Sequence, residues 1–341
     1  MTRLTQAIVN LTRLTSLSTR VLADTTGASA FVQRPPSYTV PAWAAGTGVA
    51  GYFAGGDTGS LTSGIDKITF PADTKTTLSA TLTTAREGGN GFANSGVAGY
   101  TAGGYDTGYI NALDKITFPA DTKTTLSATL TSVNATPACF ANSAVAGYVA
   151  GGYNGTYLNR VDKITFPADT KTTLSATLTT IRNGIGGFAN SGVAGYAAGG
   201  ETPYLSSIEK VTFPADTIST ISATLTAGAA EMGGMANSGV AGYTIAGDLG
   251  TGTYLSRLDK ITFPADTKTT LSATLSAAYT DVRGFANSGV AGYAGGGRPY
   301  TGPKTSAVDK FTFPADTKTT LSATLTSARS KANSFADSGI L

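Results

Sequence analysis

The chain lacks histidine altogether and contains little cysteine, tryptophan or charge. Its 341 residues include no His, a single Cys (Cys139) and a single Trp (Trp43), and only 13% are charged. Without histidine, the sequence excludes Ser-His-Asp and Cys-His catalysis and any His-ligated metal. One cysteine also excludes an intrachain disulfide and a cysteine-based zinc site.

The charge balance and the hydropathy exclude two further classes of protein. Lys and Arg number 24 against 21 Asp and Glu, a formal net charge of +3 spread over the whole chain. That balance is too weak for a nucleic-acid-binding surface. No apolar run approaches the roughly 20 residues of a membrane-spanning helix. We therefore expect no nucleic-acid partner and no membrane insertion.

What the sequence does contain is an internal repeat. Six units fill residues 48–341, and each carries a Val-Ala-Gly-Tyr motif, an acid followed by Lys, and a Phe-Pro-Ala-Asp-Thr motif. A period of nearly 50 residues is typical of propeller blades. The tyrosines that end the first motif are spaced by 48, 48, 48, 47 and 50 residues: Tyr52, Tyr100, Tyr148, Tyr196, Tyr243 and Tyr293.

Each unit is expected to form four short strands. In the second unit, Ala98-Gly99 is interpreted as a tight turn, and Pro119 breaks a strand while Asp121 bonds its own turn backbone. Four antiparallel strands per unit predict an all-β fold, a six-bladed β-propeller over residues 43–341. The expected strands of the second unit are Gly91–Val97, Tyr100–Gly104, Leu113–Phe118 and Thr124–Leu130.

The units resemble kelch repeats. A kelch repeat carries an apolar strand that ends in a Gly-Gly pair, and an Arg before the next unit. The unit-final Arg is assigned to Arg86, Arg182, Arg283 and Arg329, and the second and fourth units lack it. The usual kelch Trp is absent, and the fifth unit has Ala246-Gly247 in place of the pair. The Gly pairs are Gly55-Gly56, Gly103-Gly104, Gly151-Gly152, Gly199-Gly200 and Gly295-Gly296.

The end of the sequence predicts how the ring of blades closes. Phe335–Leu341 is a further copy of the first-strand motif, whereas residues 44–49 are only a poor copy. We expect the C-terminal strand to complete the first blade, which removes the exposed sheet edge that an open array would leave.

Residues 1–42 do not belong to the repeat. In residues 1–22, the apolar side chains fall near one face of a helix. We expect a short helical or extended segment that docks into another subunit or self-associates, for example as a trimer. A helix packed on its own propeller and a transit peptide are the alternatives. The candidate attachment residues are Leu4, Ile8, Leu11, Leu14 and Val21.

No catalytic or cofactor site is expected. Twelve of the 21 acidic residues occupy the two repeated positions, where they are interpreted as turn formers or ion pairs of the scaffold. The other nine show no sign of the carboxylate pair that a glycosidase needs. We therefore predict a non-enzymatic protein without a metal or cofactor.

Differences between the units gather on one predicted face. In a four-stranded blade, the loops between the second and third strands share a face with the crossovers between blades. These segments vary, whereas the opposite face repeats its Ala-Gly and Phe-Pro-Ala-Asp-Thr turns. Tyrosine among short polar residues suits adaptable recognition, including sugars, although neutral drift of loops would also produce variation. The candidate ligand-binding residues are Tyr105, Tyr109, Tyr153, Tyr157, Tyr204, Tyr254 and Tyr300.

Near-identical Thr/Gly-rich units after a short amphipathic segment also resemble tail-fibre or baseplate proteins of tailed bacteriophages. The resemblance implies a virion tail protein, assembled in the host cytoplasm and attached to other tail or baseplate subunits through residues 1–42. The propeller would then recognise a polysaccharide or receptor on the host surface. A cellular kelch-like scaffold that binds a protein, and a purely structural decoration of the virion, are the alternatives.

Overall fold

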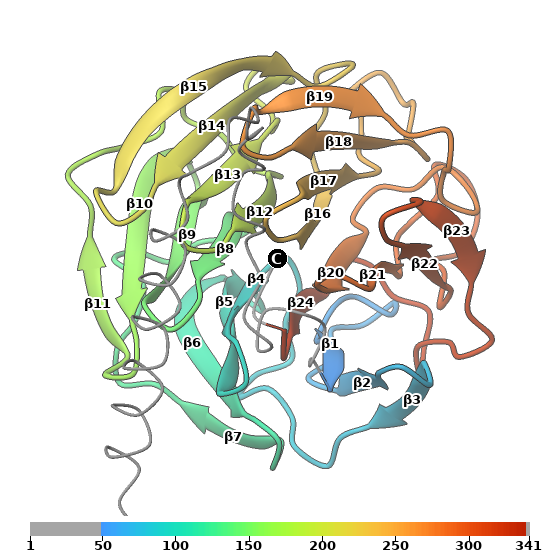
Figure 1. The fold of residues 1–341 in the computed structure, drawn as a ribbon. Helices are drawn as coiled ribbons and strands as arrows, with labels where there is room; N and C mark the ends of the chain where they lie inside the picture. The colour runs from blue at the N-terminus through green and yellow to red at the C-terminus, as the bar shows by residue number, and fades with distance from the viewer. Residues whose placement is uncertain (1–48, 339–341) are drawn as a thin grey trace, which may run out of the picture. The chain divides into compact units, whose positions relative to one another are not determined.

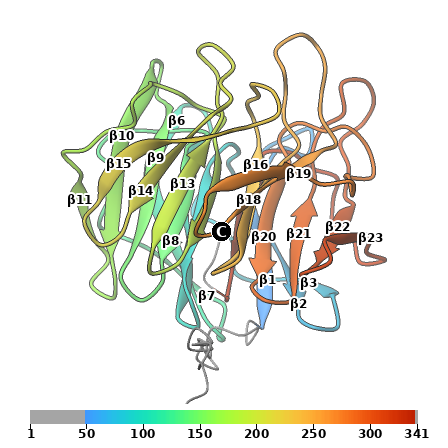
Figure 2. The same cartoon turned by 45° about the horizontal axis from the view of Figure 1, so that its top comes forward.

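The computed structural model describes residues 49–338, which form six four-stranded antiparallel sheets. The sheets are arranged around a central axis as the blades of a propeller (Figure 1), and Figure 2 shows the same ring tilted. The expected six-bladed, all-β fold is confirmed. The candidate attachment residues Leu4, Ile8, Leu11, Leu14 and Val21 lie outside the described residues.

The blades are numbered I to VI, and the strands of each are given from the axis outward. Blade I has β24 (Asn333–Ala336), β1 (Ala50–Ala54), β2 (Ile65–Thr69) and β3 (Thr74–Thr77); blade II has β4 (Asn90–Asn94), β5 (Ala98–Tyr105), β6 (Tyr109–Thr117) and β7 (Thr122–Thr125). Blade III has β8 (Ala138–Asn142), β9 (Ala146–Tyr153), β10 (Tyr157–Thr165) and β11 (Thr170–Thr173); blade IV has β12 (Gly186–Asn190), β13 (Ala194–Ala198), β14 (Ser207–Thr212) and β15 (Thr217–Thr224). Blade V has β16 (Gly233–Asn237), β17 (Ala241–Ile245), β18 (Leu258–Thr262) and β19 (Thr267–Thr270); blade VI has β20 (Arg283–Asn287), β21 (Ala291–Gly295), β22 (Val308–Thr312) and β23 (Thr317–Thr320).

Closure by the C-terminal strand is confirmed. Strand β24 pairs antiparallel with β1, with Gly51 opposite Ala336 and Ala54 opposite Asn333. The inner strands contact one another in the order β24, β4, β8, β12, β16, β20 and back to β24. The first blade is therefore built from both ends of the repeat region, and the ring has no open blade edge at the axis.

Several expected boundaries in the second unit are wrong, among them the start of the third strand, which is Tyr109 and not Leu113. The first turn is Ser95–Val97, not Ala98-Gly99, which belong to β5. The reason is packing: a side chain at Gly99 would place its Cβ 2.0 Å from the Phe335 ring, so the small residues serve a close approach and not a turn. The fourth strand is Thr122–Thr125, not Thr124–Leu130, because the chain then leaves the edge to bury Leu130.

The acid-Lys pair links each blade to both of its neighbours. Successive side chains of a strand point to opposite faces. In β6, Asp114 accepts hydrogen bonds from the Thr83 amide and hydroxyl of the crossover from blade I, at 2.9 and 2.6 Å. Lys115 instead donates to Asp169 of blade III at 2.6 Å. The Asp114-Lys115 dipeptide therefore bonds blade II to both of its neighbouring blades.

The Asp of each Phe-Pro-Ala-Asp-Thr motif forms an ion pair with the Lys of the acid-Lys pair in the preceding blade. Asp121 was expected to bond its own turn, but its carboxylate accepts hydrogen bonds from the Tyr52 hydroxyl and the Lys67 ammonium of the preceding blade, both at 2.7 Å. Its ion-pair role is thus confirmed and its turn-bonding role is wrong. The ring contains six such groups: Tyr52/Lys67/Asp121, Tyr100/Lys115/Asp169, Tyr148/Lys163/Asp216, Tyr196/Lys210/Asp266, Tyr243/Lys260/Asp316 and Tyr293/Lys310/Asp73.

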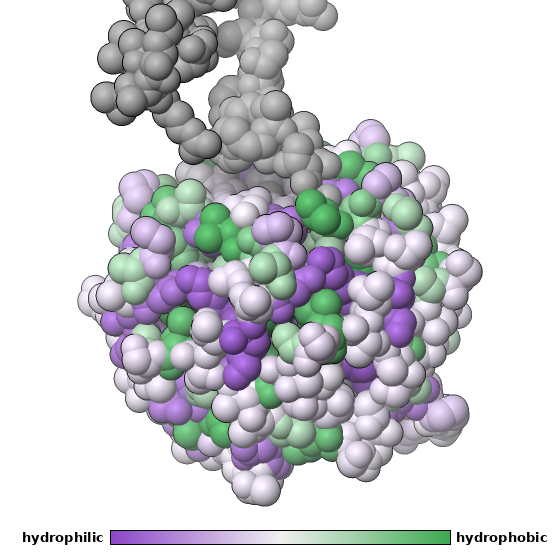
Figure 3. Space-filling view, turned by 90° about the horizontal axis from the view of Figure 1, so that it is seen from below, coloured by the Kyte–Doolittle hydropathy of each residue, from purple (hydrophilic) through white to green (hydrophobic). Residues whose placement is uncertain are grey.

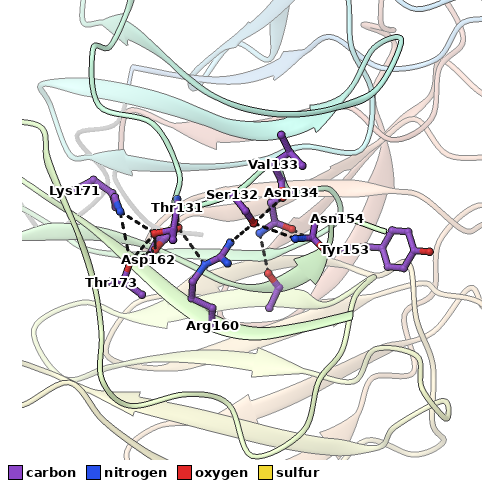
Figure 4. A network of polar contacts seen from close by, with 11 residues as sticks. Thr131, Ser132, Val133, Asn134, Tyr153, Asn154, Arg160, Asp162, Lys171 and Thr173 are labelled. Atoms are coloured by element: carbon purple, nitrogen blue, oxygen red, sulfur yellow. Dashed lines mark hydrogen bonds and ion pairs between the residues drawn. The ribbon is translucent and has the colours of Figure 1, made fainter. Parts of the chain in front are cut away.

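We call the contact between two neighbouring blades a seam, and the buried acidic residue of the acid-Lys pair the seam acid. An arginine pairs with the seam acid at five of the six seams. Arg86, Arg182 and Arg329 come from the crossover, as expected. Where the crossover lacks it, an arginine two residues before the acid takes its place. Figure 4 shows Arg160 beside Asp162 at 3.5 Å, while it also donates to the Ser132 hydroxyl at 2.8 Å.

The assignment of Arg283 as a unit-final arginine is wrong. Arg283 is the first residue of the inner strand β20, the position held by Asn90 in blade II. Tyr279 occupies the crossover position instead, and among the described residues no arginine pairs with Asp309. Among the described residues, Lys318 is therefore the only cation paired with Asp309, at 3.2 Å.

The face with the repeated turns is uniform because its side chains hold the blades together. Ser143 donates its amide to the Ser191 hydroxyl of the next blade, and Gly192 donates its amide to the side-chain oxygen of Asn142, both at 3.0 Å. The described chain enters blade I on this face, where the Phe70 amide bonds the Val49 carbonyl at 2.7 Å. On the side wall of the propeller, hydrophobic residues form only small, separate areas among polar and neutral ones (Figure 3).

Candidate functional site

The Gly-Gly pairs let the crossovers approach the axis. Gly103 and Gly104 have φ values of 62° and 118°, which disfavour other residues. A Cβ at Gly103 would lie 2.2 Å from the Asn134 carbonyl oxygen, and one at Gly104 would lie 2.7 Å from that of Glu87. The pair therefore admits two crossovers, one on each side of the blade.

A ring of backbone hydrogen bonds surrounds the axis on the variable face. Glu87 and Tyr105 exchange two hydrogen bonds, at 3.0 and 2.8 Å. The other crossovers pair with the start of the next blade's loop in the same way, except that Asn183 and Glu201 share a single bond, at 3.1 Å. The backbone is thus repeated while the side chains differ. The six loop residues of this ring are Asp57, Tyr105, Tyr153, Glu201, Asp248 and Arg298.

A second ring lies one residue further along each crossover. Its members have φ between 49° and 66°, and their amides and carbonyls link neighbouring blades; Gly88, for example, donates to the Lys331 carbonyl at 2.9 Å. Again the backbone repeats and the side chains do not. The members are Gly88, Thr136, Gly184, Glu231, Asp281 and Lys331.

Between these rings and the loops of blades II to IV lies a cavity of about 410 Å³, which we call the tyrosine basin. This volume is within the range of small-molecule sites. It brings together four of the seven predicted tyrosines. The lining residues are Glu87, Gly88, Tyr105, Tyr109, Ala135, Thr136, Tyr153, Tyr157, Asn183, Glu201, Glu231 and Lys331.

The four tyrosines form one continuous edge-to-face row. The ring centroids of Tyr105 and Tyr109 are 5.2 Å apart, those of Tyr109 and Tyr153 5.4 Å, and those of Tyr153 and Tyr157 5.1 Å. The Tyr157 hydroxyl donates to Glu201 at 3.3 Å. Burial and the Glu201 carboxylate raise the pKa of Tyr157, so its hydroxyl stays a neutral donor at physiological pH. The row lines one side of the basin with aromatic rings that carry hydroxyl groups.

The other three predicted tyrosines lie outside the basin. Tyr254 and Tyr300 pack edge to face with centroids 5.5 Å apart, and Tyr300 is 65% exposed. Tyr204 lies against Gly250, where an added Cβ would be 2.1 Å from its ring. The structure therefore divides the predicted set into a basin group and a second group over blades IV to VI.

Charged groups gather at the axial end of the basin. Burial, and then the charge of Asp281, raise the pKa of Glu231 to about 8. Burial would lower the pKa of Lys331, but the negative charges of Asp281, Glu231 and Glu87 raise it instead. The ammonium of Lys331 lies 4.0 Å from the Glu87 carboxylate. This end of the basin therefore carries charged groups of both signs.

Eight basin residues were not among the predicted site residues, and six of these have polar or charged side chains: Glu87, Thr136, Asn183, Glu201, Glu231 and Lys331. One signal could have found most of them. All but Glu201 lie four or five residues before the aromatic residue of an inner strand, or before Met235 in blade V. These two positions carry different side chains in different units, although the sequence around them repeats. Their approach to one cavity depends on the closed ring, which no single unit reveals.

No family model matches the chain, and no curated protein matches it. In residues 49–338 there is no helix of the length and hydropathy needed to cross a membrane. Within the same residues, no three acidic or cysteine side chains converge in a group that could hold a metal ion. The single cysteine, Cys139, is buried, and burial raises the pKa of its thiol.

Proposed function

We propose that the protein is a non-enzymatic virion component of a tailed bacteriophage, a tail-fibre or baseplate protein that binds host-surface polysaccharide through the tyrosine basin. One observation carries the proposal: six crossovers share a backbone geometry and present different side chains around a cavity. Shared geometry with changing chemistry is expected of a scaffold that displays a recognition surface. This proposal includes the kelch-like character of the blades, which is inferred from their Gly pairs. It also includes the resemblance to phage proteins, which is inferred from the near-identical Thr/Gly-rich repeats.

The chemistry of the basin favours a saccharide as the ligand. Tyrosine rings offer apolar faces on which sugar rings stack, and their hydroxyls reach the hydrogen-bonding groups of the sugar. The row from Tyr105 to Tyr157 provides such faces beside Glu201. Several copies on one particle would strengthen weak single-site binding.

The entry point of the chain fits display on a particle. Val49 lies on the uniform face, opposite the basin. Attachment through residues 1–42 to other tail or baseplate subunits would therefore leave the basin open. A chain that starts at Pro41 should keep the propeller but lose incorporation into particles; equal incorporation of both chains would place attachment elsewhere.

Adsorption to host cells tests the proposed recognition. The double variant Tyr109→Ala/Tyr157→Ala should bind host cells and their extracted polysaccharide at least about tenfold more weakly, because two stacking surfaces are lost. The matched control is Val97→Ala/Val193→Ala, whose parent side chains are 48% and 46% exposed on the opposite face. Equal adsorption of parent and tyrosine variant would contradict the proposal. No adsorption by the parent would favour a structural decoration.

A further inference from the structure

Buried polar atoms without partners gather at the axial end of the tyrosine basin. Among the described residues, 13 buried side-chain nitrogen or oxygen atoms lack a hydrogen-bond partner. Six of these are oxygens on four crossovers around the axis. They belong to Thr136, Asn183, Glu231, Thr280 and Asp281; the Asp281 carboxylate has the Arg298 guanidinium 3.5 Å from its Oδ2 and the Glu231 carboxyl beside it.

Three of these residues line the basin itself. The side chains of Thr136 and Asn183 are 7% and 8% exposed, and Thr136 Oγ1 and Asn183 Oδ1 accept and donate no hydrogen bond. Glu231 lines the same cavity, and its carboxyl group lies beside that of Asp281. A buried polar atom left without a hydrogen-bond partner destabilises the folded state. The basin therefore contains hydrogen-bonding groups that are available to a ligand.

The charges around these atoms restrict what the ligand can be. Lys331 already supplies a cation, so a second cation would be repelled. The carboxylates of Glu87 and Glu201 also line the cavity, and Asp281 lies behind Glu231, so an anion would be repelled as well. An uncharged ligand with many hydroxyl groups avoids both penalties, because each hydroxyl can donate to an oxygen of the basin or accept from Lys331.

We propose that the axial end of the basin binds an uncharged sugar residue of a neutral glycan. Thr136, Asn183 and Glu231 receive its hydroxyl groups, and Lys331 donates to one of them. The tyrosine row packs against the ring of the same sugar or of its neighbour. This inference rests on the proposed function, because it specifies the ligand class of the same basin.

A fractionated polysaccharide tests the ligand class. Surface polysaccharide extracted from host cells is separated by anion exchange into neutral and acidic fractions, and the full chain is titrated with each. The neutral fraction should bind, and the acidic fraction should bind at least about tenfold more weakly. Preference for the acidic fraction would overturn the inference while leaving host adsorption, and so the proposed function, intact.

Two shape-conserving variants test the residues. Thr136→Val and Asn183→Leu should each weaken binding of the neutral fraction by about five- to tenfold, the equivalent of one hydrogen bond. Their melting temperatures should stay equal or rise, because an unpartnered buried polar atom is removed. Thr107→Val, at an exposed loop tip on the same face, is the matched control.

These outcomes separate the two proposals. Unchanged binding of the neutral fraction by both variants would overturn the inference. Adsorption to cells without binding to either fraction would also overturn it and would point to a protein receptor. Binding of the neutral fraction by a chain that does not adsorb to cells would instead overturn the proposed function alone.

Discussion

The Gly of each Val-Ala-Gly-Tyr motif marks a close contact between neighbouring blades. A Cβ at Gly147 would lie 2.1 Å from the ring of Phe92 in the preceding blade. That ring is fixed in turn by stacking on Tyr100, with centroids 5.0 Å apart. The residue is therefore glycine because an aromatic ring occupies the space of a side chain.

Gly147→Ala should lower the free energy of unfolding by about 1–3 kcal/mol, the usual cost of overpacking a filled core. Urea unfolding measures the change. Gly108→Ala is the control, because a Cβ there meets nothing within 4 Å. If both variants unfold at the same urea concentration, the account of the blade contact is wrong.

The second prediction at the residue scale concerns Glu231 and pH. Its pKa is raised from an ordinary 4.5 to about 8, by burial and by Asp281. Between these values the folded protein holds a proton that the unfolded chain has lost. The contribution of Glu231 to stability is therefore full below about pH 4.5 and declines as the pH rises through 8.

Glu231→Gln keeps the shape and removes the titration. The free energy of unfolding of the parent, relative to this variant, should fall between pH 5 and pH 8. Urea unfolding at both values measures the difference. A constant difference would show that Glu231 titrates alike in the folded and unfolded states.

At the scale of the element, the seams between blades are similar but not identical. Where the crossover lacks its arginine, Arg160 in β10 and Arg257 directly before β18 approach the seam acid, at 3.5 and 3.7 Å. The seam between blades V and VI has neither arrangement. Asp309 there relies on Lys318 and on the hydroxyls of neighbouring residues.

Ala307 occupies the position of Arg160 in this seam, two residues before the acid. Ala307→Arg should therefore stabilise the protein by about 1 kcal/mol, the net value of a charge-assisted contact that remains partly exposed. Thermal unfolding measures the gain. Ala112→Arg is the control: Asp114 already pairs with Arg86 at 3.0 Å, so no gain is expected there. A gain at both positions or at neither would contradict the account.

The sequence predicted the elements better than it predicted the crossovers. Strands and blade count follow from a repeat that appears six times, and β24 follows because its motif is another copy. The turn at Ser95–Val97 was missed because small residues at Ala98-Gly99 suggest a turn when their aromatic neighbour in the preceding blade, Phe335, is unknown. Glu231 and Lys331 were missed because only the closed ring brings crossovers from distant units to one axis.

At the scale of the whole molecule, closure depends on the last strand. Phe335 is fully buried and stacks on Tyr52 with centroids 5.0 Å apart. A chain that ends at Ala332 should lose at least about 3–5 kcal/mol, as in the loss of a core phenylalanine, and should unfold or aggregate. A chain that ends at Ser338 is the control, because it keeps β24. A melting temperature of the shorter chain within about 2 °C of the control would contradict the closure.

The central claim is that one face of the propeller holds the blades together and the other binds a glycan. Hydrogen–deuterium exchange of the full chain, with and without host polysaccharide, tests it most directly. We predict slower exchange in the crossovers 83–89 and 131–137 and in the loop 153–157, with no change in the Asn-Ser-Gly turns of the opposite face. Protection confined to those turns, or binding without protection of the crossovers, would contradict the claim.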